Sequence, residues 1–264
     1  MGLTDAIFSL ADPYDRQARL YPALLAMAPA VLTVGTLYAA QATLLTSAAA
    51  LLVTCGVMFW LANLARDRGK NLEPDLFRAW GGKPSVQLLR HADLRIDPVT
   101  KQRYHVIIGG GMQVELPTAE VEAQEPARAD AIYESATKWL LEKTRDSKRF
   151  ALLFKENVSY GFRRNLLGVK PYGAAIAVAS LLWSLVASGL VQDYEPSSFT
   201  GRIAALSPSE IVAISATSFL VTLWLTGATK SRVKIAAFAY AERLLAACES
   251  LEVVPKKRGQ GAQK

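Results

Sequence analysis

Three long windows of this chain contain no charged residue. From Leu20 to Ala65, 46 consecutive residues include no Asp, Glu, Lys, Arg or His, and the same holds for residues 171–192 and 211–229. An uncharged apolar stretch of about 18–20 residues is long enough to cross a bilayer as a helix, and the first window is long enough for two helices. The windows therefore exclude a wholly water-soluble protein and predict four transmembrane helices.

The four predicted spans pair into two hairpins. The first span runs from Tyr21 or Pro22 to Tyr38 or Gln41, and the second covers residues 44–64. The turn between them is very short, which makes them antiparallel neighbours. The third and fourth spans cover residues 172–191 and 209–229.

These features predict an integral membrane α-helical protein in which a cytoplasmic α+β domain is inserted between two transmembrane hairpins. The domain of 105 residues is long enough to fold by itself. The predicted parts are an interfacial segment (1–20), the first hairpin (21–65), the inserted α+β domain (66–170), the second hairpin (171–229), and a cytoplasmic helix with a basic tail (230–264).

The first half of the inserted domain is predicted to be β structure. Short apolar runs at Val86–Leu89, Asp93–Ile96 and Tyr104–Ile108 suggest strands, and Asp97-Pro98 suggests a hairpin turn between the last two. Three glycines, Gly109 to Gly111, end the third strand, and Met112–Leu116 resumes it. Residues 117–126 are predicted to form a loop.

The second half of the inserted domain changes to helical periodicity. Residues 129–143 place apolar side chains on one face. A second helix is predicted from Lys148 to Leu167, with a break near Gly161. The order, strands first and helices after, is the basis of the α+β prediction.

The distribution of basic residues predicts the orientation in the membrane. Lys and Arg near short loops are retained on the cytoplasmic side. The turn between the first two spans has no Lys or Arg, and the connection between the last two has Arg202 alone, so 29 of the 30 basic residues lie elsewhere. We therefore expect both termini and the inserted domain to be cytoplasmic in a bacterial inner membrane.

Basic residues flank the predicted membrane boundary on both sides of the inserted domain. Anionic headgroups attract such residues by about 1 kcal/mol each near the surface. Anionic lipids are therefore the predicted partners of a membrane-surface set that comprises Arg66, Arg68, Lys70, Arg163, Arg164 and Lys170.

Two stripes of hydroxyl residues repeat every four positions within the second hairpin. Small hydroxyl residues let membrane helices pack closely and hydrogen-bond to one another, and in an oligomer they can also line a water path. An antiparallel hairpin could turn the two stripes toward each other. The members of this predicted helix-packing or pore set are Ser180, Ser184 and Ser188 in the third span, and Ser218, Thr222 and Thr226 in the fourth.

No motif in the sequence points to catalysis, a cofactor or a metal. His91 and His105 are the only histidines, and two cysteines, Cys55 and Cys248, form no metal-binding pattern with them. The Gly109–Gly111 triplet lacks the Lys and Ser or Thr that complete a phosphate loop. We therefore expect no catalytic residue, bound cofactor or metal site, and the sequence does not define the role of the two histidines.

Three functional hypotheses follow from this layout. The first is a non-enzymatic inner-membrane protein whose cytoplasmic domain senses or binds a partner while its hairpins anchor or oligomerise it. The second is a ligand-gated effector that permeabilises the membrane. The layout of two hairpins around a cytoplasmic insert loosely resembles that of four-helix effectors of bacterial nucleotide-signalling (anti-phage) defence systems, without a shared motif. The third is a membrane-bound enzyme acting through His91, His105 or nearby carboxylates.

The expected partners follow the first two hypotheses. They are anionic lipid headgroups, further copies of the same chain, and a cytoplasmic protein or a nucleotide. A nucleic acid is not expected, because the aromatic residues of the basic segment show no binding-module pattern. The net charge of +7 is thus first a signature of membrane orientation.

Overall fold

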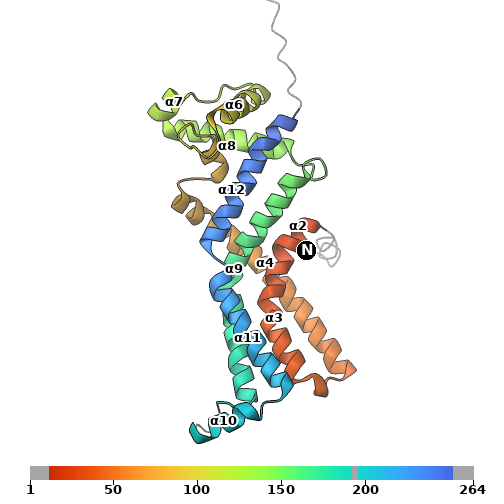
Figure 1. Ribbon diagram of the computed structural model, residues 1–264. Coiled ribbons are helices and arrows are strands. Elements are labelled where there is room, and N and C mark those ends of the chain that lie inside the picture. The colour runs from red at the N-terminus through yellow and green to blue at the C-terminus, as the bar shows by residue number, and fades with distance from the viewer. Residues whose placement is uncertain (1–11, 192–195, 252–264) are drawn as a thin grey trace, which may run out of the picture. The chain divides into compact units, whose positions relative to one another are not determined.

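The computed structural model describes residues 12–191 and 196–251, and this part of the chain is built from helices (Figure 1). The elements, in chain order, are α2 (Pro13–Asp15), the π-helical turn η1 (Arg16–Leu20), α3 (Tyr21–Leu37), the 3-10 turn η2 (Ala39–Gln41), α4 (Leu44–Trp80), α5 (Pro84–Leu89), α6 (Pro98–Met112), α7 (Ala119–Gln124), α8 (Pro126–Lys143), α9 (Ala151–Ala187), α10 (Pro196–Ala204), α11 (Pro208–Gly227), α12 (Lys230–Ala246) and the 3-10 turn η3 (Ala247–Ser250).

The predicted α+β domain is wrong, because the described residues contain no strand. Val86–Leu89 lies in α5 and Tyr104–Ile108 in α6, whereas Asp93–Ile96 belongs to the connection between these helices. Asp97-Pro98 does not turn a hairpin. The Asp97 carboxylate accepts a hydrogen bond from the Thr100 amide, and Pro98 occupies the first turn of α6, so the dipeptide starts a helix.

The three glycines also belong to α6, not to a loop or strand end. A Cβ on Gly109 would lie 2.9 Å from the Val114 carbonyl oxygen, and a Cβ on Gly111 would lie 2.4 Å from the Trp139 ring. The helix then ends at Gln113, which has a left-handed φ of 59°. Gly109 and Gly111 therefore permit close packing. Met112 is the last residue of α6, and residues 113–116 form no strand.

Elsewhere in this region helices extend further than predicted. The expected loop over residues 117–126 contains α7, with Thr118 capping its first turn. The helix predicted over residues 129–143 is confirmed as part of α8. No break occurs at Gly161, since α9 is continuous from Ala151 to Ala187 with Pro171 inside it.

The four predicted membrane spans are confirmed as helices that are long and apolar enough to cross a bilayer, which is consistent with a multi-pass membrane protein. They lie in α3, α4, α9 and α11. Residues 1–11 of the predicted interfacial segment and residues 252–264 of the predicted carboxyl-terminal part lie outside the described residues.

The chain divides into two compact units. The membrane unit consists of the described residues up to Glu73 and of those from Gly161 to Val233. The polar unit consists of residues 74–160 and the described residues from Lys234 onward. The long helices α4 and α9 each contribute residues to both units.

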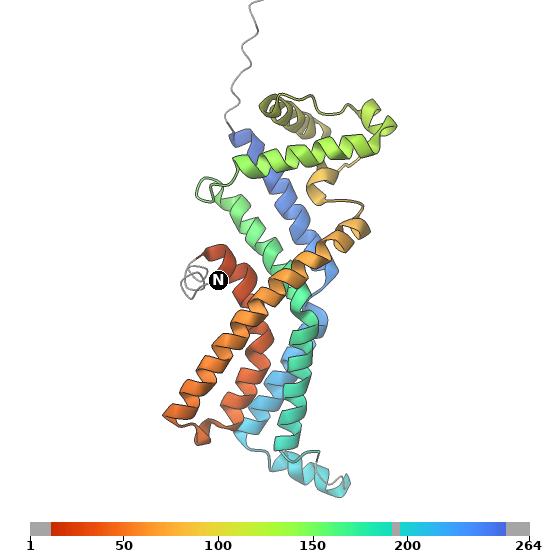
Figure 2. The same ribbon diagram turned by 180° about the vertical axis from the view of Figure 1, so that it is seen from behind.

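Small residues bring the helices of the membrane unit together. All four spans contribute to one buried cluster, with Ala26 from α3, Leu61 from α4, Ala177 from α9 and Trp224 from α11 among its members. Figures 1 and 2 both show α3, α9 and α11 side by side. The backbones of α4 and α9 approach so closely that a Cβ on Gly168 would lie 2.5 Å from the Gly69 nitrogen.

The polar unit has its own core of aliphatic and aromatic side chains. Helix α8 packs against α5, α6 and α7, and η3 packs against α6. Tyr133, Leu140 and Ile108 are fully buried at its centre, together with Leu244 and Leu245 from α12. This core fixes the short helices that form the pockets described below.

We expect Gly168→Leu to destabilise the membrane unit, because the new side chain would enter the backbone contact with Gly69. Overpacking of this kind costs about 1–3 kcal/mol, which would lower the midpoint of thermal unfolding of the purified protein in detergent. Gly56→Leu is the matched control, since nothing lies within 4 Å of a Cβ at that position in the same unit. Equal midpoints for the two variants would contradict the close packing of α4 and α9.

Candidate functional site

Buried polar side chains hold the connection between α5 and α6 in the polar unit. The ammonium group of Lys101, which is 4% exposed, donates to the carbonyl oxygens of Arg90, at 2.6 Å, and Asp93. Burial lowers the pKa of Lys101. The two carbonyl oxygens satisfy the buried cation, as a buried charge requires, so Lys101 fixes the course of residues 90–93.

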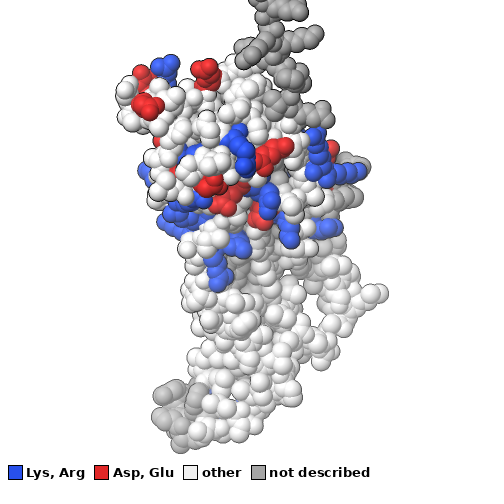
Figure 3. Space-filling model, turned by 45° about the horizontal axis from the view of Figure 1, so that its top comes forward, with Lys and Arg blue, Asp and Glu red and all other residues white. Residues whose placement is uncertain are grey.

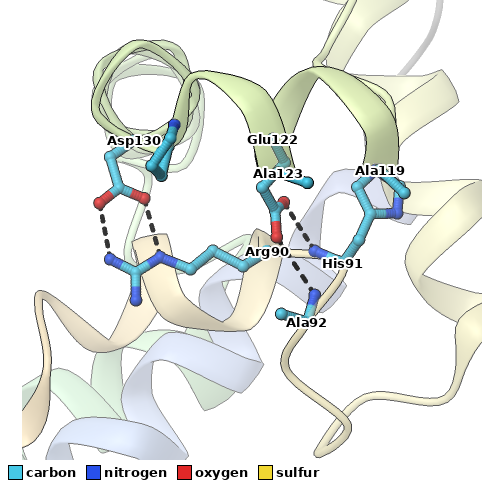
Figure 4. Close-up of a pocket in the computed structure, with 8 residues that line it drawn as sticks. Arg90, His91, Ala92, Ala119, Glu122, Ala123 and Asp130 are labelled. Atoms are coloured by element: carbon cyan, nitrogen blue, oxygen red, sulfur yellow. Dashed lines mark hydrogen bonds and ion pairs between the residues drawn. The ribbon is translucent and has the colours of Figure 1, made fainter.

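The Glu122 carboxylate of α7 receives three hydrogen bonds. The amides of His91 and Ala92 donate to it at 2.8 and 3.2 Å, and the Tyr133 hydroxyl donates at 2.8 Å (Figure 4). Burial acts to raise the pKa of Glu122, but these donors outweigh it, and the pKa lies below its usual value. Burial and the Glu122 contact together raise the pKa of Tyr133.

The two histidines lie edge to face, with ring centroids 4.8 Å apart. Nε2 of His105 lies 2.8 Å from the Leu89 carbonyl oxygen, and Nε2 of His91 lies 2.9 Å from the Pro117 carbonyl oxygen. A carbonyl oxygen can only accept, so Nε2 donates in both rings. Burial is the main cause that lowers the pKa of His105, which favours its neutral form.

A pocket of about 650 Å³ opens beside this network. On one side Arg90 makes a two-pronged ion pair with Asp130, with Nε and Nη2 at 2.8 and 2.6 Å from its oxygens. His91 and Glu122 lie on the other side of the pocket (Figure 4). Since Arg90 also donates to the Gly81 carbonyl oxygen, its guanidinium group is engaged within the protein.

A second pocket of about 700 Å³ lies along α6 and shares His91 with the first. Gln102, Val106 and Gly110 line it from α6, and the segment 113–120 lines the opposite side. Among the residues that the structure describes, its charged lining residues are Glu115 and Glu120, and none of the lining residues is Lys or Arg. This arrangement favours an uncharged or cationic occupant over a phosphate group.

Metal coordination finds no support in the described part of the chain. Residues 12–191 and 196–251 hold no group of three or more His, Cys, Asp and Glu side chains suited to a metal ion. His91 and His105 instead contact backbone carbonyl oxygens. Cys248 is buried in the polar unit and Cys55 is exposed on α4.

Arg164, one of the predicted membrane-surface residues, lies inside the membrane unit. Its Nη1 lies 2.6 Å from a Glu73 carboxylate oxygen, and its Nε and Nη2 donate to the Asn165 side-chain oxygen. Asn165 is fully buried and donates to the Ala18 carbonyl oxygen at 2.7 Å. This buried polar cluster joins α4, α9 and η1 where their charge-free segments end.

The other five predicted membrane-surface residues differ in their surroundings. Lys170 donates to the carbonyl oxygens of Leu225 and Ala228 at the end of α11, and Arg163 donates to the Arg232 carbonyl oxygen. Nε of Arg66 is buried and has no hydrogen-bond partner among the described residues. Arg68 and Lys70 are exposed. Arg68 also lies over the Tyr172 ring.

The two hydroxyl stripes do not face each other in the membrane unit. On α9, Ser180 and Ser184 are buried, and Ser184 donates to the Ser180 carbonyl oxygen, while Ser188 is half-buried. On α11, by contrast, Ser218, Thr222 and Thr226 are exposed. The buried side of α11 instead carries Ala213, Thr217 and Trp224.

No protein family, curated protein or solved structure matches this chain.

Acid should loosen the polar unit through His105. Because the pKa of His105 is lowered in the folded state, the unfolded chain binds the proton more readily. The contribution of neutral His105 to the free energy of unfolding is therefore fully present above the ordinary histidine pKa of about 6.5. This contribution is lost as the pH falls below that value. We expect hydrogen exchange of residues 98–112 in the full-length protein to speed up between pH 7.5 and 5.5, after correction for intrinsic exchange.

His105→Gln keeps a donor near the Leu89 carbonyl oxygen but cannot titrate. It should therefore show a smaller acid-induced loss of protection than the natural protein. An equal loss in both proteins would show that His105 is not the titrating group.

Proposed function

We propose that this chain is a non-enzymatic protein of the bacterial inner membrane whose polar unit binds a partner and whose membrane unit anchors it. The observation that carries this proposal is that two buried ionisable groups next to the first pocket bind the protein's own backbone: Lys101 donates to carbonyl oxygens, and Glu122 accepts from amides. Groups engaged in this way shape a binding surface and are not presented to a reacting substrate.

The polar unit and both termini face the cytoplasm in this proposal. Hydrogen bonds from Lys170 to the end of α11 and from Asn165 to η1 show that the charged ends of these membrane helices gather at one end of the unit. At the opposite end the connection 188–210 contains a single basic residue, Arg202. In the face shown in Figure 3, Lys and Arg side chains lie among Asp and Glu side chains, and an extended part of the surface carries neither. This asymmetry is typical of cytoplasmic retention of cations.

Anionic lipids are the proposed partners of the exposed cations at that end. Arg16, Arg68, Lys70, Lys230 and Arg232 are exposed in the membrane unit. Arg164 is excluded from this role, because its guanidinium group is buried against Glu73 and Asn165. The five exposed cations are therefore the residues that we propose to contact lipid headgroups.

Cysteine labelling tests the proposed orientation. In a variant carrying Cys55→Ala and Cys248→Ala, we expect Gly201→Cys on α10 to react with a membrane-impermeant maleimide in intact spheroplasts. Leu94→Cys, at a position 82% exposed in the polar unit, should react only after permeabilisation. Labelling of Leu94→Cys in intact spheroplasts would overturn the orientation.

One observation favours a second candidate function, a membrane-permeabilising effector. The stripe of Ser218, Thr222 and Thr226 lies on the exposed side of α11. The Thr222 and Thr226 hydroxyls donate to carbonyl oxygens one turn earlier, so the stripe can face lipid in a single chain. In an oligomer, α11 helices of several copies would bring such stripes together around a polar path.

Membrane potential distinguishes the two candidates. Under the anchoring function, expression should leave the signal of a potential-sensitive dye unchanged. Depolarisation that is abolished by Thr222→Leu but retained by Thr222→Ser would instead support the effector, since only the first variant removes the hydroxyl group. Membrane insertion of both variants is checked by fractionation.

A further inference from the structure

The polar unit carries an exposed apolar groove on α6. Val99 and Val106 of α6 are 71% and 64% exposed. A hollow of about 610 Å³ at the amino-terminal half of α6 shares Gln102 and Val106 with the pocket of about 700 Å³ at its carboxyl-terminal half. The two hollows therefore form one continuous surface, which we call the α6 groove.

The charge of the α6 groove differs between its two ends. At the amino-terminal end the lining is apolar apart from Gln102 and Arg103, and Arg103 is already ion-paired with Glu249 at 2.9 Å. At the other end the charged lining residues are Glu115 and Glu120. An occupant that complements this surface has apolar residues followed by basic ones.

The described chain ends beside the apolar part of this groove. Turn η3 packs against α6, as the Arg103 to Glu249 ion pair shows. Arg149 additionally donates to the Ser250 carbonyl oxygen at 2.7 Å. These two contacts hold Glu249 and Ser250, and so fix the position at which the described chain ends.

Residues 252–264 have the sequence that the groove requires. Val253 and Val254 come first, and Lys256, Lys257 and Arg258 follow. Five extended residues from Leu251 to Lys256 cover at most about 17 Å. The rise of α6 from Arg103 to Gln113 is about 15 Å, so the basic residues can reach Glu115 and Glu120 when the valines lie over Val106.

We propose that residues 252–264 dock along the α6 groove of their own chain, with Val253 and Val254 on its apolar part and the basic triplet at Glu115 and Glu120. The segment acts as an intramolecular competitor for this surface. A partner that binds the groove must displace it, so the segment sets the threshold for partner binding.

Peptide binding to the full-length protein and to a variant that ends at Leu251 tests this proposal. The probe is a fluorescent peptide of residues 252–264, measured by anisotropy in uncharged detergent to avoid binding to anionic lipid. We expect the shortened variant to bind the peptide at least about tenfold more tightly than the full-length protein, because a tethered segment competes at high effective concentration.

Two substitutions locate the binding surface. In the shortened variant, Val106→Asp should abolish peptide binding, whereas Leu152→Asp, at a position 61% exposed elsewhere in the polar unit, should leave it unchanged. Both positions are exposed, so neither variant should unfold the unit. Equal binding by the two variants would overturn the proposal.

Charge reversal supplies an independent test. The double variant Glu115→Lys and Glu120→Lys should weaken binding of the natural peptide, and a peptide in which Lys256, Lys257 and Arg258 are replaced by Glu should restore it. If the shortened variant binds no peptide but forms dimers that Val106→Asp disrupts, a second copy covers the groove and the proposal is wrong.

Discussion

The structure depends first on the absence of water from the bilayer interior. Each crossing segment must satisfy its backbone polar groups within itself, so it is a helix and excludes charged side chains. Several of the polar groups that remain buried close to these segments are paired. Arg164, Asn165 and Glu73 form one such cluster, and Lys170 satisfies carbonyl oxygens at the end of α11. Next to these charge-free segments, Gly69 and Gly168 let the backbones of α4 and α9 approach closely.

This constraint explains which parts of the fold could be predicted from the sequence. A charge-free window of 46 residues has few interpretations, and the four spans follow from such windows. The inserted segment was mispredicted because apolar runs of four or five residues fit strands and short helices equally well. Asp97-Pro98 suits a turn and a helix start alike, and only the hydrogen bond from the Thr100 amide decides. The glycine triplet is explained by contacts with Val114 and Trp139 that a sequence does not display.

The candidate site was less accessible to sequence reasoning than the spans. Glu122 and Lys101 act on backbone groups of residues 90–93, which carry no side-chain signature. Periodicity correctly groups Ser180 with Ser184, and Thr222 with Thr226, on common helix faces. It does not tell which way a face points, and here one stripe is buried while the other is exposed. The two histidines were noticed, but their hydrogen bonds to Leu89 and Pro117 depend on the fold.

The three donors on Glu122 have a consequence for how the polar unit opens. One carboxylate connects the α5–α6 connection, helix α7 and helix α8 through His91, Ala92 and Tyr133. Helix α7 has only six residues and is too short to persist alone. Its detachment would leave two amides and a buried hydroxyl without their acceptor. The three segments should therefore behave as a single cooperative unit in which local fraying of α7 is suppressed until the whole assembly unfolds.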